Sequence, residues 1–185
     1  MKKSIIITAV IIIILSIMMG SSYNSLVAMN EAVDGKWSQV ENNLQRRADL
    51  IPNLVATVKG YAVHEEDIMN EIAAARSRLV GSGSVADKAE AYAELDSALS
   101  RLLVVVENYP NLKADANFRQ LQDELAGTEN RIAVARKDYN DAVQAFNARV
   151  KSFPTVIWAR MFGFTEREYF EAEDSAQKVP QVDFD

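Results

Sequence analysis

The sequence predicts an all-α protein, in which an N-terminal transmembrane helix precedes an elongated antiparallel bundle of three to four long helices. An uncharged apolar run opens the chain, and apolar side chains later recur at alternating steps of three and four. Residues at that spacing share one face of an α-helix, so each such segment has a face to bury. Only seven glycines and four prolines interrupt the 185 residues, which also favours helix over sheet.

The first predicted element is a membrane anchor over residues 1–22. No charged side chain occurs from Ser4 to Gly20, and these 17 residues cover about 25 Å at the helical rise. Residues 21–23 extend the run to the thickness of a thin bilayer core. A cleaved signal peptide has a similar basic start and apolar middle, but the run is long for one, and Gly20 and Ser22 make a poor cleavage site. We therefore favour a retained anchor.

The charges beside the anchor predict its orientation. Lys2 and Lys3 precede the apolar run, and the first basic residue after it is Lys36. Basic residues that flank a membrane helix stay on the cytoplasmic side, so the positive-inside rule places the remainder of the chain on the extracytoplasmic side of the cell membrane.

The chain is organised around the stretch from Leu44 to Glu65, which reads LQRRADLIPNLVATVKGYAVHE. We expect one helix from Tyr23 to Val80, which continues through Pro52 with a kink because the three-four alternation stays in phase on both sides. A reversal at Pro52 is the alternative, and it would give four helices of similar length. The apolar residues that form this seam are Trp37, Val40, Leu44, Ile51, Leu54, Val58, Tyr61, Ile68 and Ile72.

Two further long helices follow. We expect the second from Val85 to about Asn108 and the third from about Lys113 to Ser152, with a proline shortly after each. Short turns between long helices make them antiparallel neighbours, and the three-four pattern predicts shallow, coiled-coil-like crossing angles. The bundle then covers residues 23–174 and leaves 175–185 as an extended tail.

Aromatic residues are concentrated after the third helix, and Trp158, Phe162 and Phe164 stand out among them. Their density indicates burial, either at the end of the bundle or against a partner. Thr165 is the expected N-cap of a further helix, with Glu168 three residues on to complete a capping box.

Two charged residues, Arg47 and Glu65, occupy seam positions that the alternation assigns to apolar residues. A buried charge needs a partner, so we predict that Arg47 enters the bundle and pairs with a carboxylate of another helix, Glu107 or Glu129. The forked guanidinium would fix the register of the helices through a bidentate contact. Trp37 stands at seam spacing, and we predict that it packs in the core rather than against a partner.

The composition argues against most kinds of chemistry. Cysteine is absent, His64 is the only histidine, and no phosphate-binding loop, serine-nucleophile elbow or dinucleotide fingerprint occurs. On a helix His64, Asp67 and Glu71 would share a face, but a single histidine makes a weak metal site and we favour a solvated acidic face. A net charge of −6 argues against nucleic acid as a partner. We predict no enzymatic activity, no cofactor, no metal and no small-molecule substrate.

Several blocks of the sequence resemble the LemA family of bacterial membrane-associated proteins. They occur in order from Tyr23 to Phe184, and the most specific are YNSLV, QRRADLIPNLVATVKGYAVHE, LLVVVENYPNLKA, FRQLQDELAGTENRIAVARKDYND, YFEAE and PQVDF. The resemblance implies an N-terminal membrane helix, an all-helical bundle and no known enzymatic activity. It also implies a short N-terminus outside the cell, which opposes the orientation that the charges predict; we keep the orientation from the charges.

These observations predict a non-enzymatic, single-pass membrane scaffold. It would contact the lipid bilayer through residues 4–20 and bind protein partners, or further copies of itself, through its bundle. The alternative is an accessory or receptor subunit of a membrane enzyme or envelope complex. Such a subunit would dock through the aromatic C-terminal region, or through an extended PQVDF tail that fills a partner's pockets.

Overall fold

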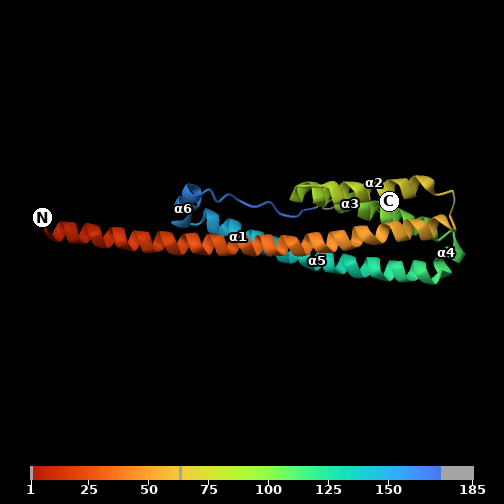
Figure 1. Ribbon diagram of the computed structural model, residues 1–185, viewed down its shortest axis with the longest axis horizontal. Helices are drawn as coiled ribbons and strands as arrows, with labels where there is room; N and C mark the ends of the chain where they lie inside the picture. The colour runs from red at the N-terminus through yellow and green to blue at the C-terminus, as the bar shows by residue number, and fades with distance from the viewer. Residues whose placement is uncertain (1, 63, 172–185) are drawn as a thin grey trace, which may run out of the picture. The chain divides into compact units, whose positions relative to one another are not determined.

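In a computed structural model, which describes residues 2–62 and 64–171, all the regular secondary structure is helical (Figure 1). The predicted all-α class is therefore confirmed, and so is the long apolar helix at the N-terminus. The tail predicted over residues 175–185 lies outside the described residues. The helices are α1 (Lys2–Lys59), α2 (Glu66–Gly81), α3 (Val85–Val106), α4 (Pro110–Ala114), α5 (Ala116–Lys151) and α6 (Thr155–Phe162).

The described residues form two compact units, and α1 and α5 contribute to both. The first unit combines residues 2–38 with residues 137–168, so it holds the N-terminal part of α1, the C-terminal part of α5 and all of α6. The second unit holds the remainder of α1 and α5 together with α2, α3, α4 and residues 169–171.

Within the first unit, α1 changes from a helix exposed on all sides to a helix with one buried face. Its N-terminal turns expose a run of isoleucines, and α1 is the one helix of the described residues that is long and apolar enough to cross a membrane. Further along, Leu26 and Val33 are fully buried, and Lys36 pairs with Asp138 of α5 at 2.8 Å. This part of α1 therefore packs against α5.

The capping box expected at Thr165 and Glu168 is wrong. The last helix of the described residues lies earlier in the chain and ends at Gly163, which adopts a left-handed conformation with φ of 78°. Glycine takes up this conformation without steric cost, so it commonly ends helices. Residues 164–171 then form no helix.

Side chains of α5 hold this non-helical segment in place. The amide group of Asn147 accepts a hydrogen bond from the backbone N–H of Arg167 at 2.8 Å and donates one to its carbonyl at 2.9 Å. The hydroxyl of Tyr139 donates to the carbonyl of Glu168 at 2.8 Å. These bonds occupy backbone groups that a helix would need for itself, which explains why the local capping signal does not prevail.

Within the second unit, α1 continues as a core helix, and α2 and α3 pack side by side (Figure 1). Most residues of the predicted seam from Val40 to Ile72 are buried, whereas Tyr61 is exposed. The large buried side chains of α1, α2, α3 and α5 in this unit include Val40, Leu44, Ile51, Leu54, Val58, Ile72, Leu79, Leu95, Leu102, Phe118 and Ile132.

The single helix expected from Tyr23 to Val80 is also wrong. The chain stays helical through Pro52 without reversing, but α1 ends at Lys59 and the chain then folds back into α2 (Figure 1). There, Gly60 and Tyr61 donate their backbone N–H groups to carbonyls three residues back, which tightens the last turn of α1. The reversal allows α2 to bury its own apolar face against α3.

Polar side chains secure this reversal. Glu65, the second charged seam position, accepts a hydrogen bond from the Tyr109 hydroxyl at 2.9 Å, and this bond raises the pKa of Tyr109. Asp115 precedes α5 and accepts hydrogen bonds from the Phe118 backbone at 2.9 Å and from the Tyr61 hydroxyl at 3.0 Å. These bonds hold the pKa of Asp115 below its ordinary value. The turn after α1 is thus tied to the start of α5.

Pro52 lies inside α1, and a neighbouring helix compensates for it. Proline has no backbone N–H, so the carbonyl of Ala48, four residues back, loses its helical partner. The Nε of Arg76 on α2 donates a hydrogen bond to that carbonyl at 2.7 Å. Ala48 is fully buried, so its carbonyl needs a donor from the protein. Arg76 therefore couples α2 to the proline of α1.

We expect Arg76→Met to lower the free energy of unfolding by about 1–3 kcal/mol, because it leaves the buried Ala48 carbonyl without a donor. The loss should be smaller in a Pro52→Ala background, where the backbone N–H of residue 52 can bond to the same carbonyl. Unfolding of the four proteins of this double-mutant cycle, followed by circular dichroism, measures the coupling.

Arg78→Met is the matched control, because Arg78 lies on the same helix but pairs with Glu94 at the exposed surface. We expect this control to change the stability by less than about 1 kcal/mol in either background. Equal losses for Arg76→Met with proline and with alanine at position 52 would contradict the coupling.

Candidate functional site

Arg47 is a buried cation in the core of the second unit. It lies on α1 between Leu44 and Ile51, which are both buried, and only 4% of it is exposed. A guanidinium stays ionised in proteins, so at this place it needs acceptors that replace water. Its two Nη groups have such acceptors, whereas its Nε has no hydrogen-bond partner among the described residues.

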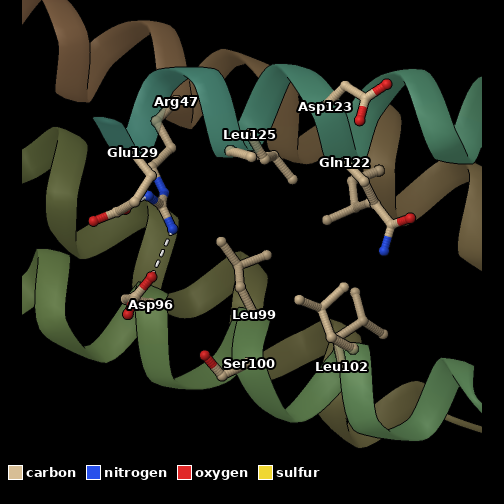
Figure 2. Close-up of a pocket in the computed structure, with 12 residues that line it drawn as sticks. Arg47, Asp96, Leu99, Ser100, Leu102, Gln122, Asp123, Leu125 and Glu129 are labelled. Carbon is tan, nitrogen blue, oxygen red and sulfur yellow. Dashed lines mark hydrogen bonds and ion pairs between the residues drawn. The ribbon is translucent and has the colours of Figure 1, made fainter. Parts of the chain in front are cut away.

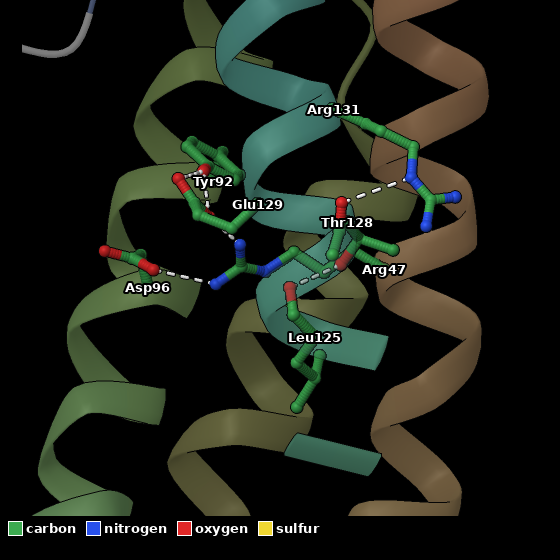
Figure 3. Close-up of polar contacts among 8 residues, drawn as sticks. Arg47, Tyr92, Asp96, Leu125, Thr128, Glu129 and Arg131 are labelled. Carbon is green, nitrogen blue, oxygen red and sulfur yellow. Dashed lines mark hydrogen bonds and ion pairs between the residues drawn. The ribbon is translucent and has the colours of Figure 1, made fainter. Parts of the chain in front are cut away.

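Carboxylates from two other helices supply the acceptors (Figure 3). Nη2 of Arg47 donates to Asp96 of α3 at 2.7 Å, and Nη1 pairs with Glu129 of α5. One guanidinium thus connects α1, α3 and α5. Glu129 is one of the two partners that the sequence suggests; the other, Glu107, pairs instead with Lys113 at 2.5 Å.

Tyr92 of α3 completes this cluster. Its hydroxyl lies 2.6 and 2.5 Å from the two carboxylate oxygens of Glu129 and donates to them, while the guanidinium carbon of Arg47 lies 5.3 Å from the centre of its ring. Burial raises the pKa of Tyr92, and the positive charge of Arg47 opposes that rise. Arg136 lies 5.9 Å from the same ring, and Phe170 packs on it with ring centres 6.2 Å apart.

The Arg47 cluster (Arg47, Tyr92, Asp96 and Glu129) is unequally exposed. The guanidinium is buried, whereas 49% of the Asp96 side chain and 41% of the Glu129 side chain are exposed. The carboxylates keep part of their hydration and the cation does not. Loss of the carboxylates would leave a buried charge unpaired, which is the costly way to break such a pair. We propose that the cluster fixes the packing of three helices.

A groove of about 370 Å³ opens beside Arg47, between α3 and α5 (Figure 2). We call it the α3–α5 groove. An apolar floor with an acidic rim suits a ligand that combines an apolar body with a positive charge. Ser100 contributes a hydroxyl, but the lining contains no histidine or lysine that could act as its base. The lining leucines are Leu54, Leu99, Leu102, Leu103 and Leu125, and the acidic residues are Asp96, Asp123 and Glu129.

Trp37 lies at the edge of the core of the first unit. It is half-buried, and its ring centre lies 5.2 Å from that of Tyr139 on α5, a side chain that is fully buried. One face of the indole therefore packs on the core.

The three other aromatic residues singled out in the sequence also lie in the first unit. Phe162 and Phe164 contact Tyr23 of α1, with ring centres 4.9 and 6.0 Å apart. Trp158 is half-buried on α6, and its indole N–H has no hydrogen-bond partner among the described residues. The structure thus brings Phe162 and Phe164 together on the helix that carries the membrane segment.

His64 lies in an exposed turn before α2 and not on a helix. The helix face expected to join it to Asp67 and Glu71 therefore does not form. Within residues 2–62 and 64–171, no group of three or more histidine, aspartate or glutamate side chains is arranged to hold a metal ion.

The sequence reasoning missed Asp96 and Arg76. Asp96 follows Tyr92 by four residues, so both share a face of α3, and that spacing beside a seam residue is the available signal. Arg76 gives no comparable signal, because its bond to Ala48 depends on how α2 folds back along α1.

The fold defines a class of protein, a helical bundle with one candidate membrane-spanning helix at its N-terminus. Within this class, residues 36–184 match the profile of the LemA family. The chain belongs to the LemA family, which confirms the family that the sequence blocks indicate.

Curated relatives match most of the chain. Magnetosome protein MamQ 2 of Paramagnetospirillum magneticum is 29% identical over 189 residues, which cover 86% of this chain and 70% of the relative. Magnetosome protein MamQ of Magnetospirillum gryphiswaldense is 26% identical over 189 residues, which also cover 86% of this chain and 70% of the relative. Protein LemA of Metamycoplasma hominis is 25% identical over 165 residues, which cover 88% of this chain and 73% of the relative.

The unequal exposure of the Arg47 cluster predicts an unequal response to substitution. We expect Asp96→Asn combined with Glu129→Gln to destabilise the protein by about 2–3 kcal/mol, because Arg47 then stays buried without a carboxylate. Arg47→Met should cost less, since methionine fills the space and the half-exposed carboxylates can be hydrated. Thermal unfolding of the full chain in detergent, followed by circular dichroism, shows which of the two variants has the lower melting temperature.

Lys137→Met is the control, because it removes an exposed ion pair with Asp141 and should leave the melting temperature nearly unchanged. If Arg47→Met were the more destabilising of the two variants, the cluster would not have the asymmetry that its burial indicates.

The raised pKa of Tyr92 predicts a pH dependence. Tyrosines of the unfolded chain lose their protons near pH 10, whereas buried Tyr92 keeps its proton to higher pH, so its contribution to stability falls as the pH rises above about 10. Tyr92→Phe should destabilise by about 1 kcal/mol at pH 7, through the lost bond to Glu129. Denaturant unfolding between pH 7 and 11 measures the difference in free energy of unfolding between this variant and the unmodified protein. We expect this difference to become smaller in the alkaline range. A stability difference that stays constant with pH would contradict a raised pKa of Tyr92.

Proposed function

We propose that the protein is a non-enzymatic scaffold, which one helix anchors in the membrane and which binds protein partners through its bundle. The observation that carries the proposal is the double use of α1. Its N-terminal turns are apolar and exposed, and the same helix then contributes Leu26, Val33 and Val40 to the buried core. An anchor that continues without a break into the fold holds that fold close to the bilayer.

The α3–α5 groove supports the binding part of the proposal. Leu103 in its lining and the adjacent Val104 are exposed apolar side chains of α3, and such patches mark interaction sites when they are rimmed by polar residues. The groove suits an amphipathic helix that inserts apolar side chains and places basic residues against Asp96 and Asp123. We assign this helix to a protein partner in the same membrane.

The charges of the N-terminus and the relatives add further support. Lys2 and Lys3 favour a bundle on the extracytoplasmic side. The relatives named as magnetosome proteins support, by analogy, a role in organising a membrane rather than in catalysing a reaction.

A photoreactive amino acid at Leu103, in the full chain expressed in cells, tests the proposal. We expect light to crosslink this position to a small number of defined proteins, because the exposed leucine lies at the groove. Affinity purification followed by mass spectrometry identifies them. Glu90 is the control position. It is exposed on the same helix but points about 140° away from Leu103 around the helix axis.

The identity of the crosslinked protein determines the kind of scaffold. Adducts with further copies of the chain would show self-assembly, whereas adducts with one other membrane protein would make this an accessory subunit. The proposal fails if position 103 gives no more adducts than position 90.

A further inference from the structure

α6 buries one face in the first unit and exposes apolar side chains on the opposite face. Thr155 and Ala159 are buried in the first unit, whereas Ile157 and Met161 are 51% and 58% exposed. Phe153, in the turn just before α6 and four residues before Ile157, is 83% exposed. An exposed apolar face opposite a buried one needs a second apolar environment, which lipid or a protein partner can supply. We call Phe153, Ile157 and Met161 the α6 face.

α6 lies beside the C-terminal end of the apolar segment of α1. Phe162 at the end of α6 packs against Tyr23 of α1, with ring centres 4.9 Å apart. Tyr23 follows Gly20, the last residue of the apolar run, by three residues, or about 4.5 Å along the helix axis. If the bilayer surrounds residues 4–20, α6 therefore stands at the level of the lipid headgroups.

The stretch 148–164, which includes α6, is basic, although the whole chain has a net charge of −6. Residues 148–164 contain Arg149, Lys151 and Arg160 and no acidic residue. Lys151 pairs with Glu166 at 2.7 Å, while Arg149 and Arg160 are exposed and have no ion pair within the described part of the chain. Anionic headgroups attract such cations when they lie near the membrane surface.

We propose that α6 is a second membrane contact, in which the α6 face inserts among the headgroups and Arg149 and Arg160 meet anionic lipid. Tyr23, which is 41% exposed, fits this position, because tyrosine is enriched at membrane–water interfaces. Interfacial helices combine apolar and aromatic residues with arginine and lysine in the same way. Two adjoining contacts, α1 through the bilayer and α6 on it, fix the angle between the first unit and the membrane plane.

Lipid is the occupant that the surroundings of the α6 face favour. α6 contacts α1 at Tyr23, just past the apolar segment, and the exposed isoleucines of that segment need an apolar solvent in any case. The nearby cations complement a lipid surface, whereas an apolar patch alone would not distinguish lipid from protein. The inference rests on the anchoring role of α1 and not on partner binding by the α3–α5 groove, so the two proposals can fail separately.

Because the chain has no cysteine, one introduced cysteine gives a single labelling site. Met161→Cys in the full chain, labelled with an environment-sensitive fluorophore, is reconstituted in phosphatidylcholine vesicles that contain phosphatidylglycerol. We expect a blue-shifted emission, strong quenching by lipids that carry a nitroxide near the headgroup, and protection from iodide in the water. Ile157→Cys should behave in the same way.

Ser38→Cys is the matched control, because Ser38 is an exposed residue of the same unit on α1, about 27 Å along the helix from Gly20. Its label should be quenched by iodide and not by the nitroxide lipid. Equal quenching patterns at positions 161 and 38 would overturn the proposal. Protection from iodide in native membranes but not in pure lipid vesicles would also overturn it, since a protein would then cover the face.

A second variant tests the role of charge. Arg149→Gln combined with Arg160→Gln should reduce the blue shift at position 161 in vesicles with phosphatidylglycerol and change it little in phosphatidylcholine alone. The same effect in both kinds of vesicle would show that the arginines do not bind anionic lipid.

Discussion

One helix in this protein has to satisfy two solvents, and the arrangement of its neighbours follows from that constraint. Along its first turns α1 is apolar all round, which suits lipid but not water. From Leu26 onward only one stripe is apolar, so the helix needs partners that cover that stripe and leave the rest in water. α5 supplies the cover in both units, with α6 added in the first and α3 in the second. The backbone of α1 needs no break where the solvent changes, since a helix satisfies its own hydrogen bonds in either.

Polar groups then decide which of many similar helix packings is formed. Leucine and valine seams fit together in several registers, because apolar contacts are not directional. Arg47 removes this freedom, as its guanidinium meets Asp96 and Glu129 only when α1, α3 and α5 are correctly aligned. Arg76 acts similarly between α2 and α1, because a single carbonyl, that of Ala48, lacks its helical donor. Both arginines thus convert local features of α1, a buried charge and an internal proline, into specific contacts between helices.

The sequence was a good guide where local and tertiary signals agree. Helices α3 and α5 begin and end within a few residues of the expected positions, because glycine or proline turns coincide with the ends of their seams. The reversal between α1 and α2 was missed because Tyr61, Ile68 and Ile72 continue the three-four spacing across it. The Thr165 cap failed because Asn147 and Tyr139 bind the backbone that follows. For the site, burial of Arg47 and its pairing with Glu129 could be anticipated from a charge on a seam, whereas Asp96 depends on the alignment of two helices.

Charge separates the two contact surfaces that we propose. The α3–α5 groove combines leucines with Asp96, Asp123 and Glu129, and an anionic bilayer repels such a rim. The α6 face combines apolar side chains with Arg149 and Arg160, which the same bilayer attracts. Each surface is apolar enough to bind either lipid or protein, so hydrophobicity alone would not tell them apart. Opposite charges around similar apolar centres give each surface a different preference, and they do so whatever the relative placement of the two units. In our proposal, Arg149 and Arg160 direct the α6 face to the bilayer, and the acidic α3–α5 groove is left for a basic protein partner.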